Sequence, residues 1–150
     1  MDHEQMMHMA LRLAEEAAEH GEVPVGCIVA DAEGRVIGRG RNRREEGSDA
    51  TAHAEIEAIR EACRNRGSWR LDGCSIYVTL EPCPMCAGAV INARIPRVVF
   101  GVREEQTGAC GSVLDLFSEN FCHHPAVFSG VCAEESRRLL QEFFQNRRKE

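Results

Sequence analysis

The sequence lacks any apolar run long enough to cross a bilayer. Its longest apolar stretches, such as Val23 to Ala30, are interrupted by Pro24 and Gly26, whereas a membrane-spanning helix needs about 20 apolar residues. The first residues, Met-Asp-His-Glu-Gln, are polar and acidic, where a secretory signal would carry positive charge followed by an apolar segment. We therefore expect a soluble, cytoplasmic protein without a membrane partner.

Excess positive charge is also missing, because 18 basic residues face 24 acidic ones and the net charge is −6. Proteins that bind nucleic acids in general present a basic surface to the phosphates. Any contact with RNA must therefore be local. Two basic segments, Arg35–Arg44 and Arg147–Lys149, are candidates for such a contact, although basic runs are usually solvated surface.

Low-complexity tracts and internal repeats are absent from the 150 residues. The chain is 43% hydrophobic and 28% charged, which is typical of a globular protein. A chain of this length can bury most of its apolar surface without the help of disulfides or a structural metal ion. We expect a single domain over residues 1–150.

Closely spaced cysteines are scarce, although the chain has eight cysteines. Without a secretory signal we expect a reducing compartment, where clustered cysteines usually bind a metal or take part in catalysis. Cys83 and Cys86 form the one close pair. The other six are separated from one another among small or apolar residues, as is typical of buried cysteines.

Hydrophobic spacing and turn residues predict alternating strands and helices. Strands are expected over 26–30, 36–40, 75–80, 98–102 and 127–131. Helices are expected over 4–19, from a cap at Thr51 to Gly67, from Pro82 through Ile91, over 134–145 and, as a short turn, over 113–117, with a loop over 41–50. This alternation predicts an α/β fold: a three-layer α/β/α sandwich with a mixed central sheet of about five strands, whose first hairpin is antiparallel and whose later crossovers are parallel.

Two short fragments carry the candidate chemistry, and each opens a predicted helix. His53 and Glu55 begin one helix, while Cys83 and Cys86 begin another. Residues three apart share one side of a helical turn, so the two sulfurs can converge. The positive end of a helix favours the thiolate, which is the form that binds zinc. We predict a zinc ion held by His53, Cys83 and Cys86 between two helix N-termini.

Three ligands of this kind leave one tetrahedral position open for water, as in catalytic zinc sites. Glu55 would then accept a proton from that water and return it to a leaving group. The alternative is a closed, structural site in which Cys74, His123 or His124 supplies a fourth ligand. A domain of this size does not need a structural metal site for stability, and a closed site would give Glu55 no role in catalysis.

The pattern H-x-E followed by P-C-x-x-C is the signature of zinc-dependent deaminases, and it is much more specific than C-x-x-C alone. Beyond the signature, the sequence closely resembles the bacterial tRNA-specific adenosine deaminases over nearly its whole length. The matching segments are Glu22–Gly26, Asn42, Thr51–Ile56, Tyr77–Ala89, Arg97–Gly101, Thr107–Ala109 and Phe143–Phe144.

The resemblance implies a cytidine deaminase-like fold, one Zn²⁺ per subunit, and conversion of adenosine to inosine at the wobble position, 34, of a tRNA anticodon. It also implies a homodimer in which both subunits shape the site for the anticodon stem-loop. Asn42 would hydrogen-bond the inserted nucleoside, with Val23 and Ala54 lining its pocket. An anticodon base is already unpaired, so moving it into a pocket costs little.

Contacts with RNA beyond the inserted base are expected near the C-terminus, where Arg147 and Arg148 follow Phe144. Glu104, a candidate substrate-binding residue, stands where the resemblance leads us to expect aspartate. Two further departures are Gln106 in place of a frequent lysine and Cys122 in place of a more usual asparagine. Two other functions remain open: a deaminase of a free base or nucleoside such as guanine, cytosine or cytidine, and a noncatalytic zinc module that binds RNA or protein.

Overall fold

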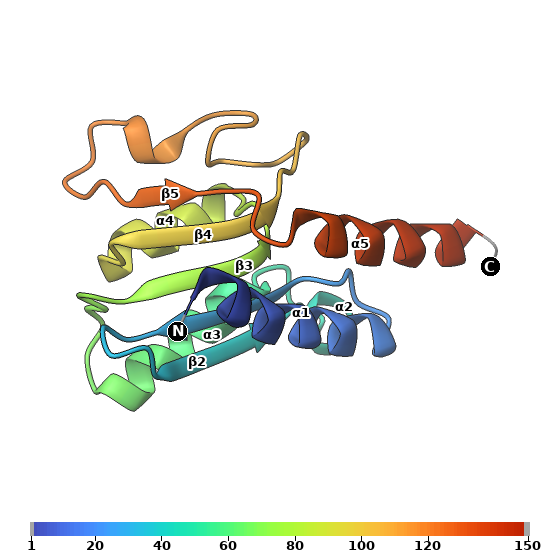
Figure 1. The fold of residues 1–150 in the computed structure, drawn as a ribbon, viewed down its shortest axis with the longest axis horizontal. Helices are drawn as coiled ribbons and strands as arrows, with labels where there is room; N and C mark the ends of the chain where they lie inside the picture. Colours follow the sequence, from blue (N-terminus) through green and yellow to red (C-terminus); the bar gives the residue numbers. More distant parts are fainter. Residues whose placement is uncertain (1, 149–150) are drawn as a thin grey trace.

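Five strands form one mixed sheet at the centre of the fold (Figure 1). The computed structural model describes residues 2–148, apart from the side chain of Arg148. The strands are β1 (Gly26–Ala30), β2 (Val36–Arg41), β3 (Ser75–Leu80), β4 (Arg97–Val102) and β5 (Ala126–Phe128). Their order in the sheet is β2-β1-β3-β4-β5. β1 is antiparallel to β2 and β3, whereas β4 is parallel to both β3 and β5.

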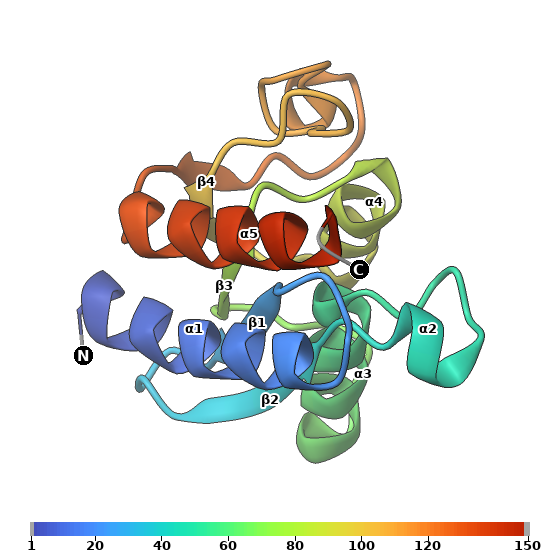
Figure 2. The ribbon, with the colours of Figure 1, turned by 90° about the vertical axis from the view of Figure 1, so that its right-hand side faces the viewer.

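Helices cover both faces of the sheet (Figure 2). On one face α1 (His3–Glu19) lies beside α5 (Ala133–Arg148), and on the other α3 (Ala54–Arg66) lies beside α4 (Pro84–Ala93). The short α2 (Arg44–Gly47) and the 3₁₀ helix η1 (Leu116–Ser118) lie in connections. The layers and the mixed sheet confirm the predicted α/β/α sandwich.

The strands β1, β3 and β4 each contribute to two apolar cores, because successive side chains point to opposite faces. In β1, Cys27 and Val29 belong to the core under α3 and α4, whereas Ile28 and Ala30 belong to the core under α1. A strand buried on both faces is continuously apolar rather than alternating. This explains why all five residues of β1 are buried.

Glycines in β2 let α3 approach the sheet closely. A Cβ atom added to Gly40 would lie 2.1 Å from the carbonyl oxygen of Ala54, in the first turn of α3, and 2.7 Å from the Ala58 nitrogen. Both neighbours are backbone atoms, which cannot rotate away as a side chain can. The first turn of α3 is therefore fixed against the end of β2.

Several predicted boundaries are wrong. Residues 44–47, expected within a loop, form α2, because the Glu22 carboxylate accepts hydrogen bonds from the Glu45 and Glu46 backbone N–H groups at 3.2 and 2.7 Å. Thr51 does not cap the next helix, because its backbone N–H and hydroxyl both donate to Asp49.

Other elements begin or end at different residues than expected. The fourth helix starts at Pro84 rather than Pro82, since the Pro82 carbonyl instead accepts from the Ala109 N–H at 2.9 Å. The helical turn expected over 113–117 is η1, the last strand is shorter than predicted and starts at Ala126, and the closing helix extends to Arg148. Within the described part of the chain, no helix is long and apolar enough to span a membrane.

Candidate active site

Two helices bring the predicted ligands to one edge of the sheet. His53 is the N-cap residue of α3, Cys83 is the N-cap residue of α4, and Cys86 is the third residue of α4. The strand register pairs Gly26 with Arg41 at the end of β2, and Cys27 with Val78 near the end of β3. The chain segments that lead into α3 and α4 therefore leave the sheet at the same edge.

The three side chains converge closely. The Nδ1 atom of His53 lies 3.6 Å from the Cys83 sulfur and 3.5 Å from the Cys86 sulfur, and all three ligand atoms lie within 4.8 Å of one another. Tetrahedral zinc, with bonds of about 2.3 Å to sulfur and about 2.05 Å to nitrogen, would separate these atoms by roughly 3.6 Å. The donor set and its spacing thus fit a zinc ion.

The residues that could close the site lie elsewhere. The Cys74 sulfur accepts from the Arg66 guanidinium at 3.3 Å. His123 and His124 contact the backbone oxygens of Ile95 and Phe117 at 2.7 and 2.8 Å. Among residues 2–148, the ligand group at this edge consists of His53, Cys83 and Cys86. Three protein ligands are the number found at catalytic rather than structural zinc sites.

The protonation of these groups is strongly coupled. A hydrogen bond from the Cys86 thiol, and then one from His53, lower the pKa of Cys83 to about 4. The hydrogen bond to Cys83 raises the pKa of His53. The bond to Cys83 and burial raise the pKa of Cys86 far above its usual value. The cluster by itself supports one thiolate, whereas a divalent cation would supply the charge needed for two.

Glu55 occupies the second position of α3 and is 4% exposed. Burial raises the pKa of its carboxyl to about 7. A carboxyl that titrates near neutral pH can both accept and donate a proton under physiological conditions. Its side chain lines the same cavity as His53 and Cys83.

This cavity has a volume of about 210 Å³ and is formed by segments from across the chain. Four residues predicted to bind substrate or RNA belong to its wall: Val23, Asn42, Glu104 and Phe144. The remaining lining residues are Val25, Arg44, His53, Glu55, Leu80, Glu81, Cys83 and Thr107. Ala54, also predicted to line the pocket, is fully buried in the core under α3 and α4.

Asn42 joins two other predicted substrate residues, Val23 and Ala54. Its Oδ1 atom accepts from the Ala54 backbone N–H at 3.0 Å, and its Nδ2 atom donates to the Val23 carbonyl at 3.1 Å. An amide has four hydrogen-bonding positions, so one donor and one acceptor position are not used by these two bonds. Asn42 can therefore support the wall and still bond a ligand in the cavity.

The C-terminal helix brings an aromatic ring to the cavity. Phe144 is 46% exposed and lines the wall. Arg147 instead lies over the Phe143 ring, 5.3 Å from its centroid, and lines a separate hollow that includes Ala18 and Gly21 of the α1 side. The predicted contact of the Arg148 side chain lies outside the described residues.

Glu81 is a supporting residue that the sequence analysis did not single out. Its buried carboxylate accepts hydrogen bonds from the backbone N–H groups of Glu104, Cys110 and Ser112, and from the Ser112 hydroxyl. Burial opposes the charge, but these bonds outweigh it and lower the pKa of Glu81. Glu81 thereby holds segment 104–112, which contributes Glu104 and Thr107 to the cavity. The only signal in the sequence was a charge directly after an apolar strand.

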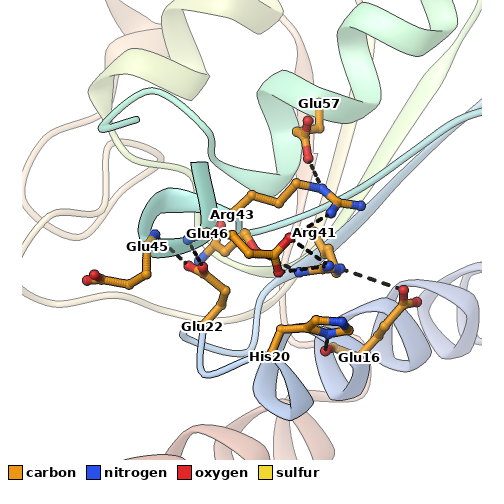
Figure 3. Close-up of polar contacts among 9 residues, drawn as sticks. Glu16, His20, Glu22, Arg41, Arg43, Glu45, Glu46 and Glu57 are labelled. Carbon is orange, nitrogen blue, oxygen red and sulfur yellow. Dashed lines mark hydrogen bonds and ion pairs between the residues drawn. The ribbon is translucent and has the colours of Figure 1, made fainter. Parts of the chain in front are cut away.

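A second support was also missed: ion pairs of Arg41 and Arg43 tie the segment that carries Asn42 and Arg44 to α1 and α3 (Figure 3). Arg41 is 3% exposed, and its guanidinium lies 3.0 Å from Glu46 and 3.6 Å from Glu16. Arg43 bridges Glu46, at 3.2 Å, and Glu57 of α3, at 2.5 Å. Both arginines were predicted only as members of a basic segment. Both form ion pairs with carboxylates of the same chain, whereas the neighbouring Arg44 lines the cavity.

Comparisons with known proteins agree with this geometry. Residues 1–102 match the family model described as "Cytidine and deoxycytidylate deaminase zinc-binding region". A tRNA-specific adenosine deaminase of Haemophilus influenzae is 47% identical over 98% of this chain and 86% of its own length. A solved structure described as "Biochemical and Structural Studies of A-to-I Editing by tRNA:A34 Deaminases at the Wobble Position of Transfer RNA" superposes with a TM-score of 0.87 and 47% identity, covering 91% of this chain and 99% of that one.

A longer relative shares the same region. A protein of Deinococcus radiodurans named tRNA(Ile)-lysidine synthase is 49% identical over 92% of this chain, which spans only 24% of that relative's length. The family match covers more than half of the chain and includes His53, Glu55, Cys83 and Cys86. This chain belongs to the cytidine and deoxycytidylate deaminase family, and within it to the tRNA-specific adenosine deaminases.

Proposed function

We propose that this chain is a zinc-dependent enzyme that hydrolyses adenosine to inosine at position 34, the wobble position, of a tRNA anticodon. The observation that carries the proposal is a single cavity of about 210 Å³ that contains both Glu55 and the His53 and Cys83 ligands. The names of the relatives support adenosine in tRNA as the substrate. The chain would act as one domain in the cytoplasm, where tRNA is modified.

His53, Cys83 and Cys86 would hold one zinc ion per chain. When bound, zinc acts as a Lewis acid that activates water for attack at neutral pH. Glu55 would take a proton from the attacking water and deliver it to the departing amine. Water adds its oxygen to C6 of the adenine ring, the C6–N6 bond breaks, and ammonia leaves. The raised pKa of Glu55 suits both transfers.

The walls of the cavity would select the substrate. Asn42 would bond the nucleoside through the positions left by its contacts to Val23 and Ala54, while Glu104 faces the same space from the opposite segment. The half-exposed Phe144 ring offers a surface on which a neighbouring base can stack. Arg44 supplies positive charge at the wall for the RNA backbone.

A homodimer is part of the proposal. Several large apolar side chains between β4 and β5 are exposed: Val113 by 57%, Leu114 by 41% and Phe121 by 49%. Exposed apolar groups close together in the chain are typical of surfaces that bind another protein. A second copy of the chain is the partner expected from the family.

The test offers purified protein an anticodon stem-loop with adenosine at the wobble position, beside matched loops with guanosine or cytidine there and the free bases. We expect ammonia release and inosine from the adenosine loop alone. Glu55→Gln should retain zinc but lose at least about 100-fold in rate, because proton transfer by a positioned side chain contributes that much or more.

Each alternative gives a different outcome in the same assay. Ammonia from free guanine, cytosine or cytidine without reaction of the stem-loop would identify a free-base or nucleoside deaminase. Bound zinc with no ammonia from any substrate would identify a noncatalytic module. A Glu55→Gln rate within a few fold of wild type would remove Glu55 from the mechanism.

A further inference from the structure

A second cluster of metal-binding side chains lies between α1 and the start of α5. The Nε2 atom of His8, in α1, lies 3.3 Å from a carboxylate oxygen of Glu135 and 3.8 Å from the Cys132 sulfur. All three ligand atoms lie within 4.8 Å of one another. None of these residues lines the catalytic cavity, which receives Phe144 from the other end of α5.

The spacing of the cluster along its helix is the same as that of the proposed catalytic ligands. Cys132 directly precedes α5 and Glu135 is the third residue of that helix, as Cys83 and Cys86 are placed on α4. The Cys132 carbonyl accepts from the backbone N–H of residue 136 at 3.2 Å, and the Cys83 carbonyl accepts from that of residue 87 at 2.9 Å. In both places a histidine from another helix faces the pair.

A surface ion pair between His8 and Glu135 does not account for the cysteine. Cys132 has a φ of +55°, a left-handed conformation that is uncommon for a residue with a side chain. Cys132 packs against the core under α1, and its sulfur lies 3.8 Å from the Nε2 atom of His8. Strained residues of this kind tend to occur where a side chain must be held in a particular direction.

The charges around the cluster favour a cation. Glu4 lies one turn before His8 on α1. The cluster itself combines one nitrogen, one sulfur and the Glu135 carboxylate, and the negative charges of Glu135 and Glu4 attract a cation. Nitrogen and sulfur donors suit zinc and similar transition metals, whereas magnesium and calcium prefer oxygen alone.

We propose that His8, Cys132 and Glu135 form a second zinc site, separate from the catalytic centre, that joins α1 to α5. His8 and Glu135 are 54% and 49% exposed at their side chains, so the ion exchanges with solvent more readily than at the catalytic centre, and water completes its coordination. Bound zinc would fix the start of α5 on α1. Because α5 also carries Phe144 to the catalytic cavity, occupancy of this site would steady one wall of that cavity.

Zinc stoichiometry tests the proposal without any measurement of activity. Purified protein is dialysed against increasing free zinc, and bound zinc per chain is measured by metal analysis. Wild type should rise from one equivalent to two. His8→Ala and Cys132→Ser should stay at one, because each loses a ligand, while the matched variants His20→Ala and Cys122→Ser should reach two. His20 and Cys122 are exposed residues outside the cluster.

A second measurement separates binding from altered folding. Without added zinc, Cys132→Ser should melt within a few degrees of wild type, and added zinc should raise the melting temperature of wild type but not of this variant. Saturation at one equivalent in both wild type and Cys132→Ser would overturn the proposal, as would a Cys132→Ser variant that still reaches two. If instead the catalytic site failed to hold zinc, wild type would reach one equivalent and Cys132→Ser none, which distinguishes that failure from this one.

Discussion

Replacing Glu81 with glutamine tests whether one buried carboxylate holds the segment that closes the cavity. Its Oε1 atom accepts from the Glu104 N–H at 3.0 Å and from the Ser112 hydroxyl, while Oε2 accepts from the Cys110 and Ser112 N–H groups at 3.0 and 3.1 Å. Glutamine has the same shape as glutamate. Its amide nitrogen would, however, replace one of these two acceptors with a donor.

The smallest cost arises when the amide nitrogen takes the place of Oε1, because the Ser112 hydroxyl can then turn and accept. The Glu104 N–H still loses its partner and faces another donor. A hydrogen bond to a charged group contributes about 1.5–3 kcal/mol, and a buried donor without a partner costs about 1–3 kcal/mol. We therefore expect Glu81→Gln to lower the free energy of unfolding by about 2–4 kcal/mol, or the melting temperature by roughly 5–15 °C.

Thermal and urea unfolding of the zinc-loaded protein at neutral pH measure this difference. Glu119→Gln, the same change at an exposed carboxylate, is the matched control and should melt with wild type. The native pKa of Glu81 lies below its usual value, so its stabilisation is present above the unfolded pKa and is lost as the pH falls through the native pKa. The gap between wild type and Glu81→Gln should thus narrow in acid. Equal melting temperatures at neutral pH would refute the assigned role.

Two further expectations concern the metal ligands. Gly40→Ala should destabilise the protein by about 1–3 kcal/mol through overpacking, because a Cβ there would lie 2.1 Å from the Ala54 oxygen beside His53. The resulting shift of His53 should also weaken zinc retention. Gly47→Ala, whose Cβ would meet nothing closer than 3.8 Å, is the control, and equal unfolding midpoints for the two variants would contradict the packing argument. Removing zinc with a chelator should expose the ligand thiols to alkylation, and Cys83 should react first, even in mild acid, because its pKa lies at about 4. Peptide mapping by mass spectrometry reads this out, and equal labelling with and without zinc would exclude the thiols as ligands.

The layers of the fold were predictable because they depend on local sequence periodicity. Apolar spacing located α1 and β1 within a residue of their ends. The start of α2 was not predictable, since the group that satisfies its first N–H donors belongs to Glu22, more than twenty residues earlier. The prediction that Thr51 caps α3 was wrong for a similar reason, because the Thr51 hydroxyl and N–H donate to Asp49 instead.

The proposed ligands were easier to predict from the sequence than the residues that support the site. His53 and Cys83 are placed by the helices they begin, so a short pattern is enough to locate them. Glu81 and Arg41 act through partners that meet only in the folded chain, such as Ser112 and Glu16. No periodicity links those positions in the sequence. A buried charge with distant partners is therefore the feature that sequence reasoning misses.

The arrangement separates the proposed chemistry from the proposed selection of substrate. The proposed ligands and Glu55 lie at or within one turn of the N-termini of two helices packed on the sheet, where α3 is fixed by the backbone contact at Gly40. The cavity walls come instead from connecting segments and from the end of α5, including Asn42, Glu104 and Phe144. Helix starts packed on a sheet tolerate little movement, whereas connecting segments vary more readily. Changes in the walls should consequently shift which base is accepted while the metal and the proton-transfer group stay in place.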